Sequence, residues 1–122
     1  PISELVNVGT GERPPAPPAV PSGVAQQIAA DMMAAQYGWG GDQFSCLASL
    51  WDRESGWNVY ASNSYSGAYG IPQACPGSKM SAFGDDWQTN PATQIAWGLS
   101  YIAGRYGTPC GAWSTFLSKG WY

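Results

Sequence analysis

Proline placement confines the folded part of this chain to residues 24–122. Six of the ten prolines lie in the first 23 residues, most of them in the run ERPPAPPAVPSG. Closely spaced prolines keep a backbone extended, so this stretch is typical of a semi-rigid linker. It is either a leader without a role or a spacer that joins the module to another part of a longer polypeptide. We therefore expect a Pro-rich tail at residues 1–23 and one compact domain at residues 24–122.

Charge and composition exclude several classes of function. A net charge of −3, with five Lys plus Arg in 122 residues, argues against nucleic acid and against an anionic membrane surface, which both require clustered cations. No apolar run approaches the roughly 18 residues that span a bilayer, so we expect no membrane insertion. The chain has no His, only scattered Cys and no glycine-rich phosphate loop, so we expect no metal and no organic cofactor. What remains is carboxylate chemistry, or binding without chemistry.

Apolar spacing predicts helices in three long segments. One helix is expected from Val24 to the stop signal YGWGG, and a second through QFSCLASLWDRE with Asp42 as its N-cap. A third is expected to begin with Asn90 as N-cap and Pro91 in the first turn, and Gly107 and Pro109 are expected to end it. The domain should therefore be mainly helical.

The remaining segments are short or irregular. Residues 55–77 are rich in Gly, Ser, Asn and Tyr with weak periodicity, which predicts a loop or a small irregular antiparallel sheet. A short helix is expected at residues 112–117. The expected architecture is thus a helical domain with one small β or loop region.

Three cysteines allow three pairings on paper. Cys46 falls in the second predicted helix and Cys110 just after the third, so a bridge between them would pin together two helices that must pack. We favour this pair, with Cys75 as a free thiol. By the loop-entropy model the bridge contributes about 4 kcal/mol. The alternative is three reduced, buried cysteines in a cytosolic protein.

Glu54 is the one glutamate of residues 24–122. At about 100° per residue it shares a helix face with Leu47, Leu50 and Trp51, which places its carboxyl at the buried face. Desolvation there is expected to raise the pKa of the carboxyl, so that it stays protonated near neutral pH and can donate a proton to a leaving group. The simpler alternative is a helix-end carboxylate that only hydrogen-bonds a neighbour.

Most glycosidases use two carboxylates, which lie about 5 to 9.5 Å apart. Asp52 lies about 160° round the helix from Glu54 and is expected to point away. Asp85 and Asp86 belong to the polar turn FGDDWQTNP, where a solvated turn or a helix cap is the expectation.

The segment that follows, ESGWNVYASNSYSGAYGIPQ, resembles the catalytic core of lytic transglycosylases and goose-type lysozymes. In that family a Glu-Ser at a helix end is followed by an Asn, an Ala and a small polar residue, and then by Gly-x-Gly-hydrophobic-x-Gln. The matching positions here are Glu54-Ser55, Asn58, Ala61, Asn63 and the run GAYGIPQ at 67–73. The segments GLSYI at 98–102 and RYG at 105–107 are similar to a helix that follows this core in the family. IPQ, PGSKM, the favoured cysteine pair and the terminal GWY look like its actinobacterial and phage branch.

The resemblance implies a fold, a reaction and a partner. The fold would be lysozyme-like α+β and mainly helical. Its irregular region would line a groove that binds the sugars of peptidoglycan. Glu54 would protonate the β-1,4 glycosidic oxygen between N-acetylmuramic acid and N-acetylglucosamine. It would then take the C6 hydroxyl proton, giving a 1,6-anhydromuramoyl product without water. One carboxylate suffices because the substrate's N-acetyl group can assist the cationic centre.

The resemblance also implies substrate-binding residues. Asn63 and Gln73 match the family's small polar and glutamine positions and would hydrogen-bond the N-acetyl group and sugar hydroxyls, beside Ser55. The family's Ala-Tyr-Asn motif is absent, and Ala-Trp-Ser stands at 112–114. Tyr101 or Trp113 would therefore replace the substrate-orienting tyrosine.

Aromatic residues, 14% of the chain, support a sugar ligand independently, because pyranose rings stack on aromatic rings. Tyr65 and Tyr69 lie in the Gly-rich loop and are the strongest candidates for stacking. Trp51 and Trp97 lie on helices and are expected in the core. The other candidates for the groove are Tyr60, Trp87 and Trp113.

Three functions stay open: a lytic transglycosylase, a hydrolytic muramidase on the same scaffold, and a glycan-binding module without turnover. Each has peptidoglycan glycan strands as partner, and the isolated module is expected to be a monomer. Because both the wall and this chain are anionic, we expect a targeting domain or a virion to deliver it. The expected location is extracellular, at the cell wall, or on a phage particle as an endolysin or tail lysin.

Overall fold

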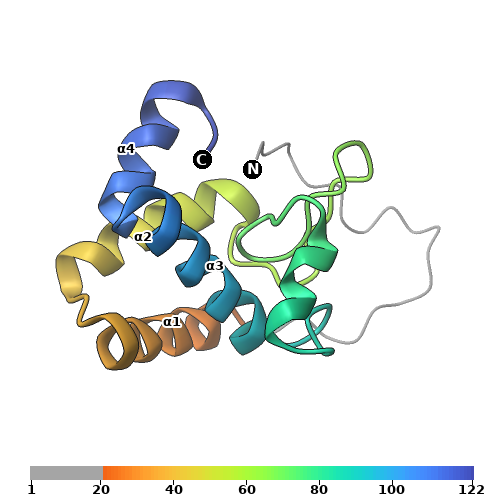
Figure 1. Cartoon of the computed structure of the whole chain (residues 1–122), viewed down its shortest axis with the longest axis horizontal. Helices are drawn as coiled ribbons and strands as arrows, with labels where there is room; N and C mark the ends of the chain where they lie inside the picture. The colour runs from red at the N-terminus through yellow and green to blue at the C-terminus, as the bar shows by residue number, and fades with distance from the viewer. Residues whose placement is uncertain (1–20) are drawn as a thin grey trace.

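The predicted helices occur in residues 21–122, the part of the chain that this computed structural model describes (Figure 1). The described part is mainly helical, and each of its helices is too short or too polar to cross a membrane. The Pro-rich tail expected at residues 1–23 falls almost wholly outside it. The elements are α1 (Ser22–Tyr37), α2 (Gly41–Ser55), the 3₁₀-helix η1 (Gly77–Phe83), α3 (Pro91–Tyr106) and α4 (Pro109–Lys119).

Helix α3 lies in the middle of the domain and contacts three other elements. It packs against α1, α4 and η1, while α2 packs against α4 and α1 (Figure 1). The Trp51 ring of α2 reaches α3 at Gly98, where a β-carbon would lie 2.5 Å from the ring. Trp51 is fully buried, which confirms its predicted place in the core. Through this one side chain the end of α2 contacts α3.

The start of α3 is the one that the sequence predicts. Asn90 is the N-cap, its side-chain oxygen accepts a hydrogen bond from the Ala92 amide at 2.9 Å, and Pro91 occupies the first turn. An interior-facing row of apolar side chains follows along the helix, and Gly107 ends it. The N-cap hydrogen bond satisfies an amide that would otherwise have no partner in the helix.

Helix α4 is longer than the predicted segment 112–117. It begins at Pro109 and runs to Lys119, and the Thr108 hydroxyl accepts a hydrogen bond from the Gly111 amide at 3.1 Å. Thr-Pro at 108–109 is therefore a helix start of the same kind as Asn-Pro at 90–91. From the sequence, Pro109 was expected only to end the preceding helix.

The N-terminus of α2 corrects another prediction. Gly40, not Asp42, is the N-cap, and its carbonyl accepts the first helical hydrogen bond from the Phe44 amide at 3.0 Å. Gly40 can cap because its backbone is extended there, with φ −99° and ψ −159°. Asp42 lies in the first turn, where a carboxylate still interacts favourably with the helix dipole.

Residues between α2 and α3 form loops and η1, and no continuous strand occurs in this segment. Two isolated antiparallel bridges, Ser62 with Tyr69 and Tyr69 with Ala74, are all that remains of the small sheet considered from the sequence. The 3₁₀-helix η1 was not predicted, because its residues carry no helical period.

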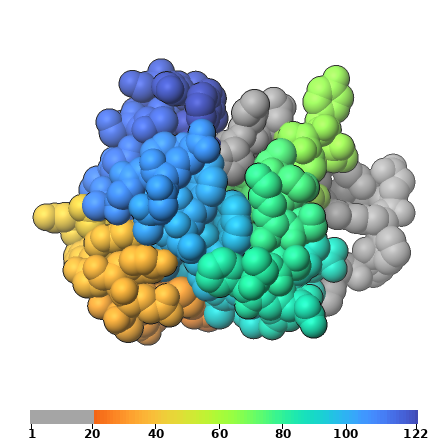
Figure 2. All heavy atoms as spheres, in the orientation of Figure 1, coloured from red at the N-terminus to blue at the C-terminus, as the bar shows by residue number. Residues whose placement is uncertain are grey.

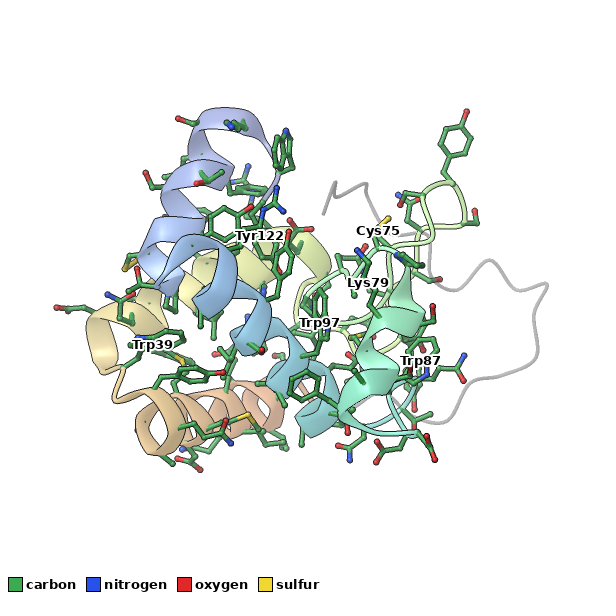
Figure 3. All side chains as sticks on the ribbon, in the orientation of Figure 1. Trp39, Cys75, Lys79, Trp87, Trp97 and Tyr122 are labelled. Carbon is green, nitrogen blue, oxygen red and sulfur yellow. A yellow bond between two sulfur atoms is a disulfide. The ribbon has the colours of Figure 1, made fainter. Side chains whose placement is uncertain are left out.

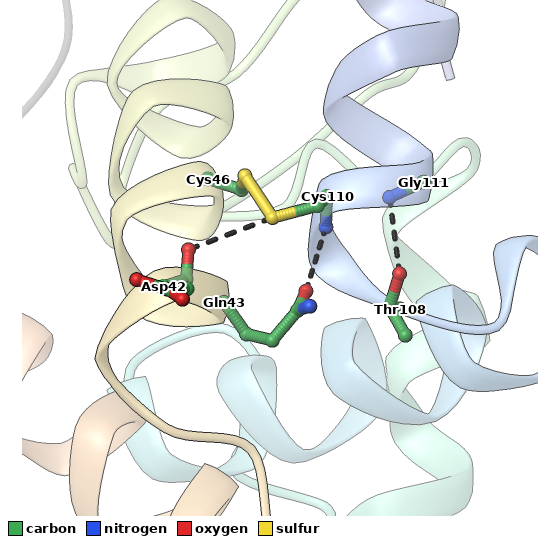
Figure 4. Close-up of a disulfide and its surroundings, with 6 residues drawn as sticks. All are labelled: Asp42, Gln43, Cys46, Thr108, Cys110 and Gly111. Carbon is green, nitrogen blue, oxygen red and sulfur yellow. Dashed lines mark hydrogen bonds between the residues drawn. A yellow bond between two sulfur atoms is a disulfide. The ribbon is translucent and has the colours of Figure 1, made fainter.

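The disulfide joins Cys46 in α2 to Cys110 in the first turn of α4 and confirms the favoured pairing (Figure 4). The two Cα atoms are 5.0 Å apart, across a sequence separation of 64 residues. Beside it the Cys110 amide donates to the Gln43 side-chain oxygen at 3.0 Å. Cys75 is a free thiol. The bridge therefore ties the helix that carries Glu54 to the C-terminal helix.

Removal of this bridge should destabilise the domain strongly. Replacing Cys46 and Cys110 by Ala should lower the free energy of unfolding by about 4 kcal/mol, because the unfolded chain regains the freedom of a long loop. Guanidinium unfolding measures this change, with Cys75→Ala as a matched control that should lose far less. An unchanged midpoint in the double variant would contradict the assignment.

Candidate functional site

Glu54 lies in the last turn of α2 with its side chain inside the domain. It is 1% exposed, next to the fully buried Leu50 and Trp51, which confirms the predicted face. Asp52, two residues earlier, is exposed as expected. A carboxyl group in this position is removed from water yet sits at a helix end, where a loop can bring other groups to it.

Ser55 attaches that loop to the helix end. Its hydroxyl donates to the Ile71 carbonyl at 2.7 Å, and the Trp51 carbonyl lies 3.3 Å from the same oxygen. The residue beside Glu54 thus positions the segment 70–73 against α2. Its predicted contact with substrate stays a prediction.

Gln73 is fully buried in this loop and has a left-handed backbone conformation, φ 56°. Its amide nitrogen donates to the carbonyls of Gly70 at 2.9 Å and Ala61 at 3.2 Å. Its side-chain oxygen has no hydrogen-bond partner among the described residues. Any hydrogen bond to substrate, which remains a prediction, would therefore have to use that oxygen.

Asn63 is buried and closes the tip of the Gly-rich loop. Its side-chain oxygen accepts from the amides of Tyr65 at 2.8 Å and Ser66 at 3.1 Å, an arrangement that stabilises a tight turn. Tyr65, at that tip, is 98% exposed. The structure thus gives Asn63 a clear role in shaping the loop, and its predicted role in sugar binding stays a prediction.

A pocket of about 290 Å³ opens between α3, η1 and the C-terminal residues. Figure 2 shows this face, with α3 on one side and η1 on the other, and Figure 3 shows Cys75 and Lys79 across from Trp97 and Tyr122. Helix α3 contributes side chains at intervals of four residues, which share one helix face. The lining residues are Cys75, Lys79, Trp97, Tyr101, Arg105, Trp121 and Tyr122.

Glu54 interacts electrostatically with two phenols of this pocket. Burial, then the neighbouring Tyr106, and to a smaller degree the Glu54 charge raise the pKa of Tyr101 to about 12. Burial and next the Glu54 charge raise the pKa of Tyr122 well above its ordinary value. Both phenols therefore keep their protons at neutral pH and can donate hydrogen bonds. Glu54 is not part of the pocket lining, but its charge acts on two of the residues that are.

Tyr122 connects the parts of the site, although no sequence pattern indicated a role for it. It is fully buried, its hydroxyl accepts from the Trp51 indole at 2.9 Å and donates to the Pro72 carbonyl at 2.8 Å. One hydroxyl thus joins α2, the loop that Ser55 holds, and the C-terminal segment. The available signal was the terminal GWY, which the resemblance included without assigning a function.

The two candidates for the orienting aromatic residue lie in different places. Tyr101 lines the pocket and stacks on Trp97, with ring centroids 5.0 Å apart and planes at 14°. Trp113 instead stacks on Phe116 of its own helix, 5.7 Å away. Placement favours Tyr101. Trp97, expected in the core, is partly exposed and lines the pocket, because it lies one turn before Tyr101 on the same face.

The loop aromatics lie away from this pocket. Tyr69 donates its hydroxyl proton to the Gln88 carbonyl at 2.7 Å and packs edge-on against Trp87, at 5.5 Å between centroids. Tyr60 is partly buried against the core. Among the described residues, neither these side chains nor Tyr65 contributes to the pocket lining.

Asp86 serves the start of α3 and not the pocket. Its carboxylate accepts from the side-chain amide nitrogen of Asn90 at 2.8 Å and from the Thr93 hydroxyl at 2.7 Å, and these hydrogen bonds hold its pKa below its ordinary value. The expectation of a helix cap or solvated turn is confirmed. Within residues 21–122 no group of three or more His, Cys, Asp or Glu side chains is placed to hold a metal ion.

Comparison with protein-family models, with curated proteins and with solved structures finds no match to this chain.

Tyr122→Phe should destabilise the domain, because it leaves the Trp51 indole N–H and the Pro72 carbonyl buried without their partner. The expected loss in free energy of unfolding is about 1–3 kcal/mol. Thermal or denaturant unfolding measures it. Tyr65→Phe, the same change at an exposed loop tip, is the matched control and should have no effect; equal stability of both variants would show that the Tyr122 hydroxyl carries no such role.

Proposed function

We propose that this chain is a lytic transglycosylase domain of lysozyme-like architecture that cleaves peptidoglycan glycan strands. The observation that carries the proposal is a buried glutamate at a helix end, whose charge acts on two phenols that line an aromatic pocket. This geometry lies at the Glu-Ser motif on which the family resemblance rests. The scissile bond is the β-1,4 bond between N-acetylmuramic acid and N-acetylglucosamine.

Glu54 acts first as the general acid. Removal from water disfavours the charged form of a carboxyl group, which suits a residue that must donate a proton to the leaving oxygen. Tyr101 is suited to accompany this step, since its hydroxyl remains protonated at neutral pH and lines the pocket. Tyr122 has a positioning role, because its hydroxyl proton is donated to the Pro72 carbonyl. The stacked pair Trp97 and Tyr101 offers an aromatic surface to the sugar ring.

Glu54 then acts as the base that removes the C6 hydroxyl proton of the muramoyl unit. Attack by that oxygen on C1 closes the 1,6-anhydro ring, so the bond is broken without water. Hydrolysis usually needs a second carboxylate to activate water. Asp52 is exposed, Asp86 is hydrogen-bonded to Asn90 and Thr93 at the start of α3, and no acidic side chain of the described residues lines the pocket. The single-carboxylate reaction therefore has the better support.

The disulfide fits the proposed setting. Disulfides persist in oxidising surroundings such as the extracellular space, where the peptidoglycan substrate is found. The module would act there as a secreted wall enzyme or as the lysin of a phage particle.

Glu54→Gln should abolish release of soluble fragments from purified peptidoglycan, since removal of a general acid costs about 10²–10⁴-fold in rate. Asp52→Asn is the matched control: it neutralises an exposed carboxylate of the same helix and should keep full activity. Fragment release is followed by chromatography of the supernatant.

Activity retained in Glu54→Gln would overturn the assignment of the acid. Tight glycan binding by the unmutated protein, without cleavage and unchanged in Glu54→Gln, would establish a glycan-binding module instead.

A further inference from the structure

Basic side chains are few in the described part of the chain, and two of the four line the pocket. Residues 21–122 contain Arg53, Lys79, Arg105 and Lys119 as their only Lys and Arg. Lys79 and Arg105 both line the pocket, from η1 and from α3. The ammonium of Lys119 lies 5.1 Å from the ring centroid of Trp121, which lines it too. The pocket is therefore a cationic site in a chain whose net charge is −3.

Arg105 is held at the wall of the pocket by aromatic rings. Its guanidinium carbon lies 5.9 Å from the ring centroid of Tyr101 and 5.9 Å from that of Tyr106, distances typical of cation–π contacts. Stacking of this kind leaves the edge of the guanidinium group free to donate paired hydrogen bonds to a carboxylate. Lys79, on the facing element η1, supplies a second positive charge without fixed geometry (Figure 3).

The pocket combines this charge with surfaces suited to a sugar. Trp97, Tyr101 and Trp121 provide apolar rings, while no acidic side chain of the described residues joins the lining. A volume of about 290 Å³ lies at the lower end of the range for small-ligand sites, so it suits one sugar unit with its substituent. A ligand that is both ring-shaped and anionic matches these features better than a neutral sugar.

We propose that this pocket binds a carboxylate carried by the glycan strand, with Lys79 and Arg105 as its charge partners. The inference rests on the proposed function, because it names which strands the site prefers: those that bear carboxylates, over neutral chains of N-acetylglucosamine. The carboxylate has two possible sources, the lactyl group of an unsubstituted muramic acid or the stem peptide attached to that group.

Local charge also answers the electrostatic problem posed by an acidic module and an anionic wall. The net charge repels the wall at long range, but charges farther apart than about 10 Å are largely screened at 0.1 M salt. At contact distance the carboxylate of the strand meets Lys79 and Arg105, not the acidic residues elsewhere on the surface. The preference should therefore be strongest at low salt and weaken as salt is added.

Fluorescence titration tests the inference directly, because Trp97 and Trp121 line the pocket. The protein is the Glu54→Gln variant, so that no probe is cleaved. The probes are a neutral tetramer of N-acetylglucosamine, an alternating tetrasaccharide with free lactyl carboxylates, and the same tetrasaccharide with stem peptides. We expect at least one carboxylate-bearing probe to bind about tenfold more tightly than the neutral tetramer, the effect of one charge-assisted hydrogen bond.

Added substitutions identify the charge partners. The double variant Lys79→Gln/Arg105→Gln should lose the tenfold preference for carboxylate-bearing probes. The single variant Arg105→Lys should keep part of this preference. Arg53→Gln is the matched control, since this cation lies over the Phe116 ring, 5.6 Å from its centroid, and should leave the preference intact. Preference for the free lactyl probe identifies the lactyl carboxylate as the ligand, and preference only for the peptide-bearing probe identifies the stem peptide.

Equal affinity for neutral and carboxylate-bearing probes, no binding of any probe, or a preference that survives loss of Lys79 and Arg105 would overturn the inference. Peptidoglycan cleavage by the unmutated protein, measured in parallel, separates the two claims. Cleavage without a carboxylate preference would support the proposed transglycosylase and contradict the proposed carboxylate-binding site. A carboxylate preference without cleavage would support the carboxylate-binding site and contradict the proposed transglycosylase.

Discussion

One buried side-chain amide, that of Gln94 in α3, holds the irregular half of the domain together. Its oxygen accepts from the Ile71 amide at 2.9 Å, and its nitrogen donates to the carbonyls of Val59 at 3.1 Å and Trp87 at 2.8 Å. These segments have no strand ladder to satisfy their backbone groups, and each group left buried without a partner would cost about 1–3 kcal/mol. Gly70 fits beside this amide only because it lacks a β-carbon, which would lie 2.6 Å from the Gln94 oxygen. The central helix thus supplies the order that a sheet would otherwise give.

The position of Glu54 depends on that amide through a short chain of contacts. Gln94 fixes the Ile71 amide, and Ser55 donates to the carbonyl of the same residue, so the loop is held both to α3 and to the end of α2. Tyr122 adds a third connection through Trp51. The helix end that carries Glu54, the loop at residues 70–73 and Tyr122 are therefore joined by one set of hydrogen bonds. The proposed acid catalysis needs such positioning.

The features that could be predicted from the sequence are those set by residues a few positions apart in the chain. Asn90 and Pro91 start α3 as expected, and helical periodicity placed Glu54 on the buried face. The pocket was not predicted, because periodicity shows that Trp97 and Tyr101 share a face but not what the face meets. Tyr122 was missed for a related reason: its burial depends on where the C-terminal segment folds back, which no local pattern encodes.

The central claim is that one buried carboxylate breaks the glycosidic bond without water. The most direct test is mass spectrometry of fragments released from peptidoglycan in H₂¹⁸O. We expect 1,6-anhydromuramoyl ends that are one water lighter than hydrolysis products and carry no ¹⁸O from the cleavage. Reducing muramoyl ends that have gained one ¹⁸O during bond cleavage, after correction for later exchange at C1, would contradict it and identify a muramidase.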